Sequence, residues 1–442
     1  MADAAVAAIA RLETDLGATP KATKPYEHAL LAHRLGVAYA EAFAGRFEER
    51  LRRALACFDV AATLLDPRFH PVEHARVLTA AGSARRSLGE PAAALDLFSR
   101  AEDLAGGRAG GDEAAAMVNN IGLALLELSD LPGAIERFDA AIAGFGTDTP
   151  DGRRGRTSAL HNRGLARAAS GRSADLAAAL CDYDAASAGV AFDEAPLHHG
   201  LVQHSRGVAA AALADAKDAP DGSEVCRQAA IDAFTAALDV FGWPDHAIQH
   251  GIASFNLGRM WARSDELDQL RRALLCFEDA VTAFDPRHQP APWRQAYDAL
   301  LATEARLAPD HAGWTRTDHL LAMLDSDPER APRLVRGRLA RWLPLPAAAR
   351  NAAVNGYVGA AVREGGDIGT GALVHLLATV MELPLEAQAV VLDALLAVRA
   401  TADSDGRDRI DLLVDRAVGE AVVGPQRVFV RDHLVAGGFE RP

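Results

Sequence analysis

Lysine, aromatic residues and paired cysteines are scarce in this chain, and long apolar runs are missing. Three of its 46 basic residues are lysine, aromatic residues make up 6% of the 442 residues, and the four cysteines form no CxxC pair. Such widely spaced cysteines argue against a disulfide framework and indicate a reducing compartment. No window approaches the roughly 18 uninterrupted apolar residues of a membrane-spanning helix, so we expect no insertion into a membrane.

Net positive charge is also missing. Asp and Glu outnumber Lys and Arg by 60 to 46, which gives a formal net charge of -14. This balance argues against nucleic acid or an anionic membrane as the main partner. Half of the residues are hydrophobic, with alanine prominent among them, so the composition favours a folded core of closely packed helices.

The start of the chain suggests where the protein works. The stretch MADAAVAAIARLE contains a short apolar run, but it has neither a basic leading region nor a cleavage-type context. Together with the cysteine usage, this favours a cytoplasmic protein. The strong bias toward arginine and alanine suggests a GC-rich bacterial coding sequence.

A pattern of small and aromatic residues recurs along the first two thirds of the chain. In AMVNNIGLALLELSDLPGAIERFDAAIAGF, Gly122, Ala134, Phe138 and Ala141 fall at positions 8, 20, 24 and 27 of a unit. Such repetition predicts stacked helical hairpins, because one hairpin cannot bury its apolar face alone. The same grid fits five more units, whose residues at positions 8 and 24 are Gly36 and Phe58, Gly82 and Phe98, Gly164 and Tyr183, Gly207 and Phe234, and Gly258 and Phe277.

Each unit is predicted to form two antiparallel helices, A and B. The glycine at position 8 lets the helices approach closely, and the aromatic ring at position 24 fills the gap between them. This pattern resembles the tetratricopeptide repeat superfamily over roughly Tyr26 to Leu307. The glycines are 46, 40, 42, 43 and 51 residues apart, longer than the family's repeat of about 34. In this respect the chain is similar to long-repeat bacterial members, and the resemblance implies an all-α solenoid.

The last third of the chain has a different pattern. After a helix predicted at 290–307, LPL triplets at 343–345 and 383–385 lie 40 residues apart, and each precedes an apolar helix. This interval is compatible with HEAT-like helical pairs, and an ordinary helical bundle is an equal alternative. We therefore predict four segments, which are an N-terminal helix or cap at 1–27, a solenoid at 28–307, a linker at 308–330 and a C-terminal α-helical domain at 331–442.

Candidate binding residues follow from the resemblance, because A helices line the concave face in that family and present positions 2, 5, 6, 9 and 12 to ligands. Asparagine there suits an extended peptide, since its amide offers two donors and an acceptor. NNIG, HNRG and FNLG resemble the NNLG segments of peptide-binding members. The alternative is that these asparagines only bond a neighbouring helix or loop. The candidate ligand-binding residues are Asn119, Asn120, His161, Asn162, His204, Asn256 and Arg259.

Several other sites are disfavoured. The basic residues of the family's carboxylate clamp are missing, so a free C-terminal carboxylate is not the predicted ligand. HPVEH and HAIQH place histidines four residues apart, as metal ligands can be, but no third ligand is identifiable, and we predict neither a metal nor a cofactor. Cys57, Cys181 and Cys276 neighbour the packing aromatic of helix B, which favours buried cysteines over nucleophiles. No catalytic residue is assigned.

The segment PERAPRLVRGRLARW concentrates Arg330, Arg333, Arg336, Arg338 and Arg341 in an otherwise acidic chain. One interpretation is docking to an acidic partner or to phosphate. The interpretation that we favour is a helix whose arginines are solvated or pair within the molecule.

The sequence thus predicts a non-enzymatic binding or scaffold protein, whose concave groove holds a peptide or protein segment. One alternative is an enzyme or enzyme subunit that binds a small molecule in a pocket, with His161 or His204 as acid–base residue. Another is a regulatory protein whose arginine-rich junction is a hinge. The partner's identity and the oligomeric state stay open.

Overall fold

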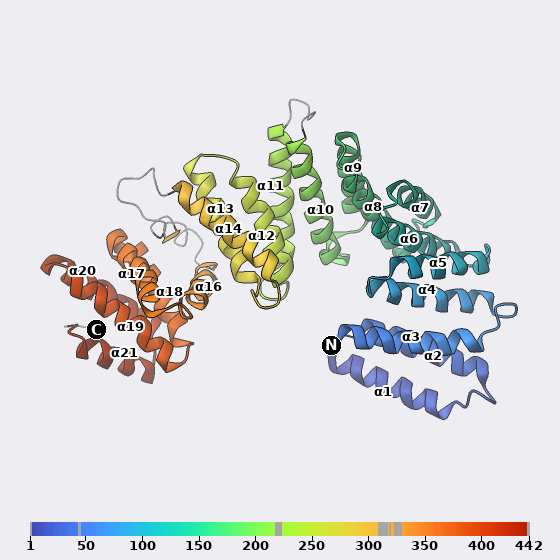
Figure 1. Cartoon of the computed structure of the whole chain (residues 1–442), viewed down its shortest axis with the longest axis horizontal. Helices are drawn as coiled ribbons and strands as arrows, with labels where there is room; N and C mark the ends of the chain where they lie inside the picture. Colours follow the sequence, from blue (N-terminus) through green and yellow to red (C-terminus); the bar gives the residue numbers. More distant parts are fainter. Residues whose placement is uncertain are drawn as a thin grey trace. The chain divides into compact units, whose positions relative to one another are not determined.

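The computed structural model describes residues 2–42, 46–216, 223–307, 317, 320–321 and 329–439. Over these ranges the chain forms 20 α-helices and one short 3-10 helix, with no strand (Figure 1). The helices pack in neighbouring pairs, so the predicted all-α, solenoid-type fold class is confirmed. Most of the predicted linker at 308–330 lies outside the described residues.

The chain divides into two compact units, Met1–Ala229 and Ala230–Pro442. In the first unit, each of the first four A helices packs against its own B helix and against the next A helix along the chain. The A helices are α2 (Pro25–Glu41), α4 (Pro71–Ser87), α6 (Gly111–Glu127), α8 (Pro150–Ala169) and α10 (Pro196–Asp215). The B helices are α3 (Phe47–Leu64), α5 (Pro91–Ala105), α7 (Leu131–Gly144) and α9 (Ser173–Gly189). Helix α1 (Ala2–Ala18) comes before the first hairpin, and the 3-10 helix η1 (Phe192–Glu194) comes directly before α10. Helix α11 (Ser223–Val240) contains the boundary between the two units.

A glycine on helix A faces an aromatic ring on helix B in each hairpin for which this contact is described. A Cβ atom added at Gly122 would lie 2.6 Å from Cε1 of Phe138, far inside the 3.5–4.0 Å of a relaxed carbon contact. The predicted seam between positions 8 and 24 is therefore confirmed. The corresponding distances are 2.5 Å for Gly36 and Phe58, 2.6 Å for Gly82 and Phe98, 2.5 Å for Gly164 and Tyr183, and 2.8 Å for Gly258 and Phe277.

The loops between hairpins are held by histidines that sequence reasoning did not assign to this role. Four histidines lie eight residues before the seam glycine of their A helix, and each bonds a backbone carbonyl nine residues upstream, where the preceding helix has ended. A carbonyl oxygen only accepts, so the ring nitrogen donates. The bonds run from His28 Nδ1 to Thr19 O at 2.6 Å, His74 Nδ1 to Leu65 O at 2.7 Å, His199 Nε2 to Val190 O at 2.8 Å, and His250 Nδ1 to Phe241 O at 2.8 Å.

This bond from a histidine ring to an upstream carbonyl, here called the clasp, gives one histidine in each of the two HxxxH segments a structural role. His74 is buried, and its bond satisfies the carbonyl of Leu65, one of the acceptors left without a partner at the end of α3. In α8 the equivalent place belongs to Arg156, whose Nη1 donates to Ile142 O at 2.6 Å. A recurrent bond of this kind fixes the entry of five A helices despite the lengthened repeats, whereas α6 has Ala114 at the equivalent place.

Replacing His74 by alanine should lower the free energy of unfolding by about 1–3 kcal/mol, because a buried carbonyl loses its donor. The measurement is urea unfolding followed by far-UV circular dichroism. His288→Ala is the control, since that side chain is 78% exposed and bonds only locally, to Asp285. Equal midpoints for the two variants would contradict the clasp.

The second unit continues with one more hairpin and then changes its packing. Beyond α13 the helices form two layers, with α16, α18 and α20 stacked in one and α17, α19 and α21 in the other. A proline immediately precedes each of α17 and α19, as predicted, but the two prolines hold different places: Pro346 directly follows the first LPL triplet, and Pro384 is the middle residue of the second. The helices are α12 (Ala247–Trp261), α13 (Leu267–Ala283), α14 (Pro290–Leu307), α16 (Ala331–Trp342), α17 (Ala347–Glu364), α18 (Gly366–Met381), α19 (Leu385–Thr401), α20 (Ser404–Ala421) and α21 (Pro425–Ala436).

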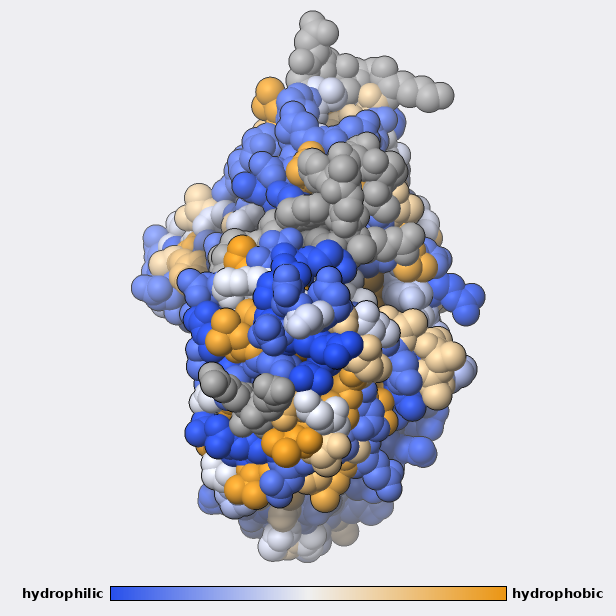
Figure 2. Space-filling model, turned by 90° about the vertical axis from the view of Figure 1, so that its left-hand side faces the viewer, coloured by the Kyte–Doolittle hydropathy of each residue, from blue (hydrophilic) through white to orange (hydrophobic). Residues whose placement is uncertain are grey.

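A single hydrophobic core joins the last hairpin of the second unit to its C-terminal helices, from Leu270 to Phe439. Some apolar residues of this unit stay on the surface, such as Leu412 and Val423. Figure 2 shows apolar side chains in small groups separated by hydrophilic ones on the face that it presents. The C-terminal helices are thus held by their core with the repeats.

The arginine-rich segment forms α16 and packs against α13, a helix buried on every side from Ala273 to Val281. Glu278 and Asp279 of α13 are 0% and 1% exposed. Arg338 Nε donates to Glu278 Oε1 at 2.8 Å, and Arg341 Nη2 donates to Glu278 Oε2 at 2.6 Å. The interpretation of intramolecular pairing is therefore confirmed. Among the other arginines, Arg330 and Arg333 lie 3.2 and 3.1 Å from Asp279, and Arg336 pairs with Glu382.

Candidate functional site

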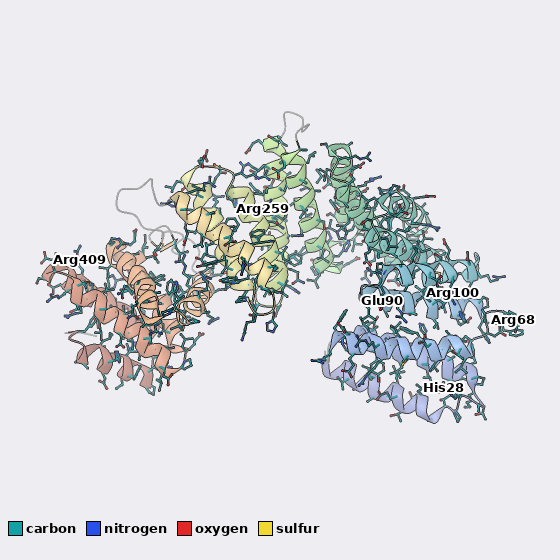
Figure 3. The ribbon with its side chains drawn as sticks, viewed as in Figure 1. His28, Arg68, Glu90, Arg100, Arg259 and Arg409 are labelled. Carbon is teal, nitrogen blue, oxygen red and sulfur yellow. The ribbon has the colours of Figure 1, made fainter. Side chains whose placement is uncertain are left out.

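The candidate binding residues are divided between the two units. In the first unit, α6 carries Asn119 and Asn120, α8 carries His161 and Asn162, and α10 carries His204, all of them half-buried. In the second unit, α12 carries half-buried Asn256 and exposed Arg259 (Figure 3). The first unit therefore contains five of the seven candidates on three consecutive A helices.

Two of these candidates bond each other across neighbouring A helices. Asn162 Nδ2 donates to Asn119 Oδ1 at 3.0 Å. One helix further on, Nε2 of His161 lies 3.0 Å from Oγ of Ser205. Both bonds join position 5 of one repeat to position 6 of the next, so the alternative role, in which these residues tie helices together, is observed. This bond uses neither of the two N–H donors on Asn119 Nδ2 nor the carbonyl oxygen of Asn162.

His161 is a neutral side chain in this environment. Burial, followed by the charge of His198, lowers the pKa of His161 to about 4. The His161 ring lies 5.6 Å from that of His198 and 5.7 Å from that of Tyr183, measured between centroids. Burial also lowers the pKa of His204 and of His198. A general base works best with a pKa near the operating pH, so these histidines are suited to hydrogen bonding rather than to proton transfer.

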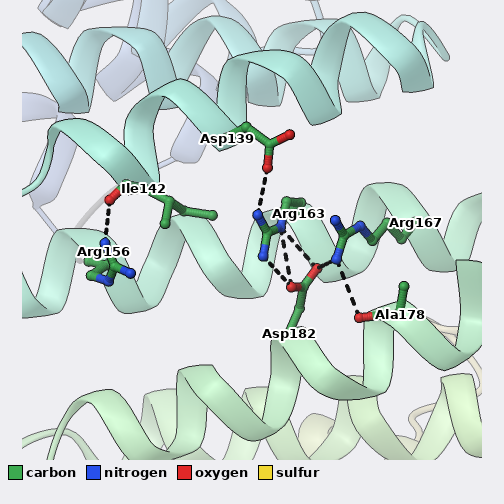
Figure 4. A network of polar contacts seen from close by, with 7 residues as sticks. All are labelled: Asp139, Ile142, Arg156, Arg163, Arg167, Ala178 and Asp182. Atoms are coloured by element: carbon green, nitrogen blue, oxygen red, sulfur yellow. Dashed lines mark hydrogen bonds and ion pairs between the residues drawn. The ribbon is translucent and has the colours of Figure 1, made fainter.

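The helix that carries His161 and Asn162 is fixed to both of its neighbouring B helices by arginines (Figure 4). Arg163 Nε lies 3.1 Å from Oδ2 of Asp182 on α9, and Arg163 Nη1 donates to Asp139 on α7. Arg167 Nη1 donates to the same Asp182 carboxylate at 2.7 Å. Asp182 is only 3% exposed, so these charge-assisted bonds act away from solvent. The network holds the candidate residues of α8 in one orientation.

Sequence reasoning missed this network. Asp182 occupies position 23, where two other repeats have Cys57 and Cys276. A carboxylate directly before the packing aromatic, together with arginines beside the seam glycine, is the signal that marks the pairing.

Exposed apolar side chains also lie on one of these A helices. Leu201 and Val208 of α10 are 46% and 44% exposed and occupy positions 2 and 9 of their repeat. Polar amides on α6 and α8 thus lie on the same array of A helices as an apolar strip on α10.

Comparisons with known proteins add little to this geometry. No family model matches the chain, and no curated protein matches it. Among solved structures, the crystal structure of yeast Tom70 is similar, with 9% identity over 93% of this chain and 96% of that chain, at a TM-score of 0.22. A similarity at this level carries no argument about function.

The cysteines and the possible metal ligands were also predicted from sequence. All four cysteines are free, and burial raises the pKa of Cys276 to about 12. Cys276 is buried as predicted and Cys57 is half-buried, but Cys181 is exposed, so the prediction that it is buried was wrong. Within the described ranges, no group of three or more His, Cys, Asp and Glu side chains could hold a metal ion, and none of the helices is long and apolar enough to cross a bilayer.

Proposed function

We propose that the first unit is a non-enzymatic scaffold that holds an extended peptide or protein segment along the inner faces of α6, α8 and α10. The observation that carries this proposal is the bond between Asn119 and Asn162, which fixes two amides in a defined polarity. Asn119 offers N–H donors and Asn162 a carbonyl acceptor, which match the alternating C=O and N–H groups of an extended backbone. Asn120 adds a third amide on the same helix as Asn119.

Rigidity supports binding at this site. Arg156, Arg163 and Arg167 tie α8 to α7 and α9, so the amides need little ordering when a segment binds. Groups that are already ordered lose little conformational entropy on association. Leu201 and Val208 extend the surface with apolar contact area. Asn256 and Arg259 of the second unit are proposed to contribute a separate polar patch to partner binding.

No specific observation favours the enzyme alternative, because the pKa values of His161 and His204 are lowered by burial. The hinge hypothesis gains no support either, since α16 and α13 are joined by buried ion pairs that would lose their partners on opening. The proposed setting is the cytoplasm, in agreement with the free cysteines.

The proposal is tested by binding the purified chain to an array of random 12-residue peptides and measuring affinities of the selected peptides by fluorescence polarisation. Asn120→Ala combined with Asn162→Ala should weaken binding by about 5- to 100-fold, because two amide contacts are lost. Helicity should be unchanged. Asn351→Ala, an exposed asparagine of α17, is the control. Unchanged affinity in the double variant would remove the groove assignment.

A further inference from the structure

A cavity of about 310 Å³ opens between the first two A helices, at the other end of the proposed binding face. Its walls are Val37 and Ala40 of α2 and Ala80, Ser83, Ala84 and Ser87 of α4. Leu51 and Phe58 of α3 form its apolar base, and Phe47, which is 53% exposed, stands at its edge. The volume is at the lower end of the range for ligand pockets, enough for one bulky side chain rather than for a large cofactor.

The cavity exists because small side chains occupy places that are filled elsewhere in the array. At the contact between α6 and α8, Leu123, Leu126 and Leu165 occupy positions 9 and 12 of α6 and position 9 of α8. They are half-buried and pack on the core around Phe138 and Tyr183. At the contact between α2 and α4, Val37 and Ala40 occupy positions 9 and 12 of α2, and Ser83 occupies position 9 of α4. Three smaller side chains at these positions leave the cavity open, whereas three leucines fill the corresponding space between α6 and α8.

The charge at the rim indicates what enters. Among the described residues that line the cavity, Glu41 is the charged one, and it is exposed. A carboxylate beside an apolar pocket favours a cation next to an apolar anchor and disfavours an acidic neighbour. The acidic balance of the chain, with a net charge of -14, acts in the same direction.

We propose that this cavity is the anchor pocket for one bulky apolar side chain of a partner segment, flanked by a lysine or arginine that pairs with Glu41. The inference rests on the proposed function, since the same segment then continues to the amides of α6 and α8. Packed helices stand about 8–10 Å apart, and an extended chain covers about 3.3 Å per residue. The anchor therefore precedes or follows the amide-bound backbone by roughly five or six residues.

The test is an oriented library of 12-residue peptides with one fixed aromatic or aliphatic residue, bound to the full chain. The expected motif is that residue next to Lys or Arg. Ala40→Leu with Ser83→Leu copies the filled contact between α6 and α8, so the variant should fold and lose the apolar preference, with affinity for selected peptides reduced about 10- to 100-fold. Glu41→Lys should abolish the preference for basic neighbours while the apolar preference persists.

The control adds the same two leucines elsewhere. Ala92→Leu with Ala93→Leu places them on exposed positions of α5 and should leave the motif unchanged. If the filled variant selects the same peptides as the wild type, while Asn120→Ala with Asn162→Ala still weakens binding, the pocket assignment is overturned and the scaffold stands. If the wild type selects acidic neighbours, the pairing with Glu41 is overturned. If it binds no peptide at all, both proposals fall.

Discussion

Replacing Glu278 by alanine is expected to destabilise the second unit by about 3–5 kcal/mol, because buried Arg338 and half-buried Arg341 would lose their shared carboxylate. Glu278 is 0% exposed and accepts from both guanidinium groups. A second acid, Glu304 of α14, lies 3.5 Å from Arg338 and is too distant to replace it fully. Urea unfolding, combined with hydrogen exchange of peptides from α13 and α16, would measure the loss and locate it.

The matched control lies on the same helix. Arg336 and Glu382 form an exposed pair, with side chains 54% and 59% accessible, so Arg336→Ala should cost less than about 1 kcal/mol. Replacing Glu278 and Arg338 together by methionine should recover part of the loss, since one guanidinium group rather than two is then left without the Glu278 carboxylate. A single Glu278 variant as stable as Arg336→Ala would show that the cluster does not hold α16 to α13.

The same cluster makes the second unit sensitive to acid. Burial alone raises the pKa of Glu278, but Arg338 and Arg341 more than offset this effect, and its pKa is lowered overall. Burial acts to raise the pKa of Asp279 as well, but the neighbouring His250 and the charges of Arg330 and Arg333 outweigh it, so this pKa is likewise lowered. A lowered carboxyl pKa contributes stability that is present above the unfolded value of about 4 and is lost as the pH falls below it. Hydrogen exchange of α13 should therefore accelerate below about pH 4, and less so in α6, which lacks such a buried pair.

The repeat seam could be predicted from sequence because it depends on residues whose spacing repeats. A glycine and an aromatic ring at fixed positions predict a close approach of two helices, and the same contact is found in each hairpin for which it is described. The proline-led helices of the C-terminal region could likewise be predicted from sequence. Whether these helices form stacked layers or a bundle could not be predicted. That choice depends on which helix faces meet, and the packing of α17 on α19 and of α18 on α20 decided it.

The candidate site could be predicted only in part, because the hydrogen-bond partner of each side chain depends on how neighbouring repeats pack. The sequence placed Asn119 and Asn162 on A helices, but their mutual bond depends on the offset between those helices. The clasp of His74 was missed because a histidine four residues after another suggested a metal pair, while its acceptor is a backbone atom that no sequence pattern displays. The cavity beside Ser83 was missed because it is an absence of bulk, visible only when two repeats are packed together.

Removing the ring of Phe138 should cost about 3–5 kcal/mol, since this side chain is completely buried between α6 and α7. Gly122→Ala should cost about 1–3 kcal/mol, because its Cβ would lie 2.6 and 2.8 Å from two ring carbons of Phe138. If the two residues act as one seam, the losses do not add. Gly122→Ala with Phe138→Leu should be more stable than the sum of its single variants implies, because the smaller side chain relieves the overlap.

Gly356→Ala in α17 distinguishes this seam from the ordinary behaviour of helical glycine. A Cβ at Gly356 would meet nothing within 4 Å, so alanine there should stabilise the protein by about 0.5–1 kcal/mol through helix propensity alone. The double-mutant cycle, measured by urea unfolding, should show coupling at Gly122 and Phe138 of about 0.5–3 kcal/mol. Additive losses at that pair, or a stabilising Gly122→Ala, would mean that the close approach of helices A and B is not what the glycine provides.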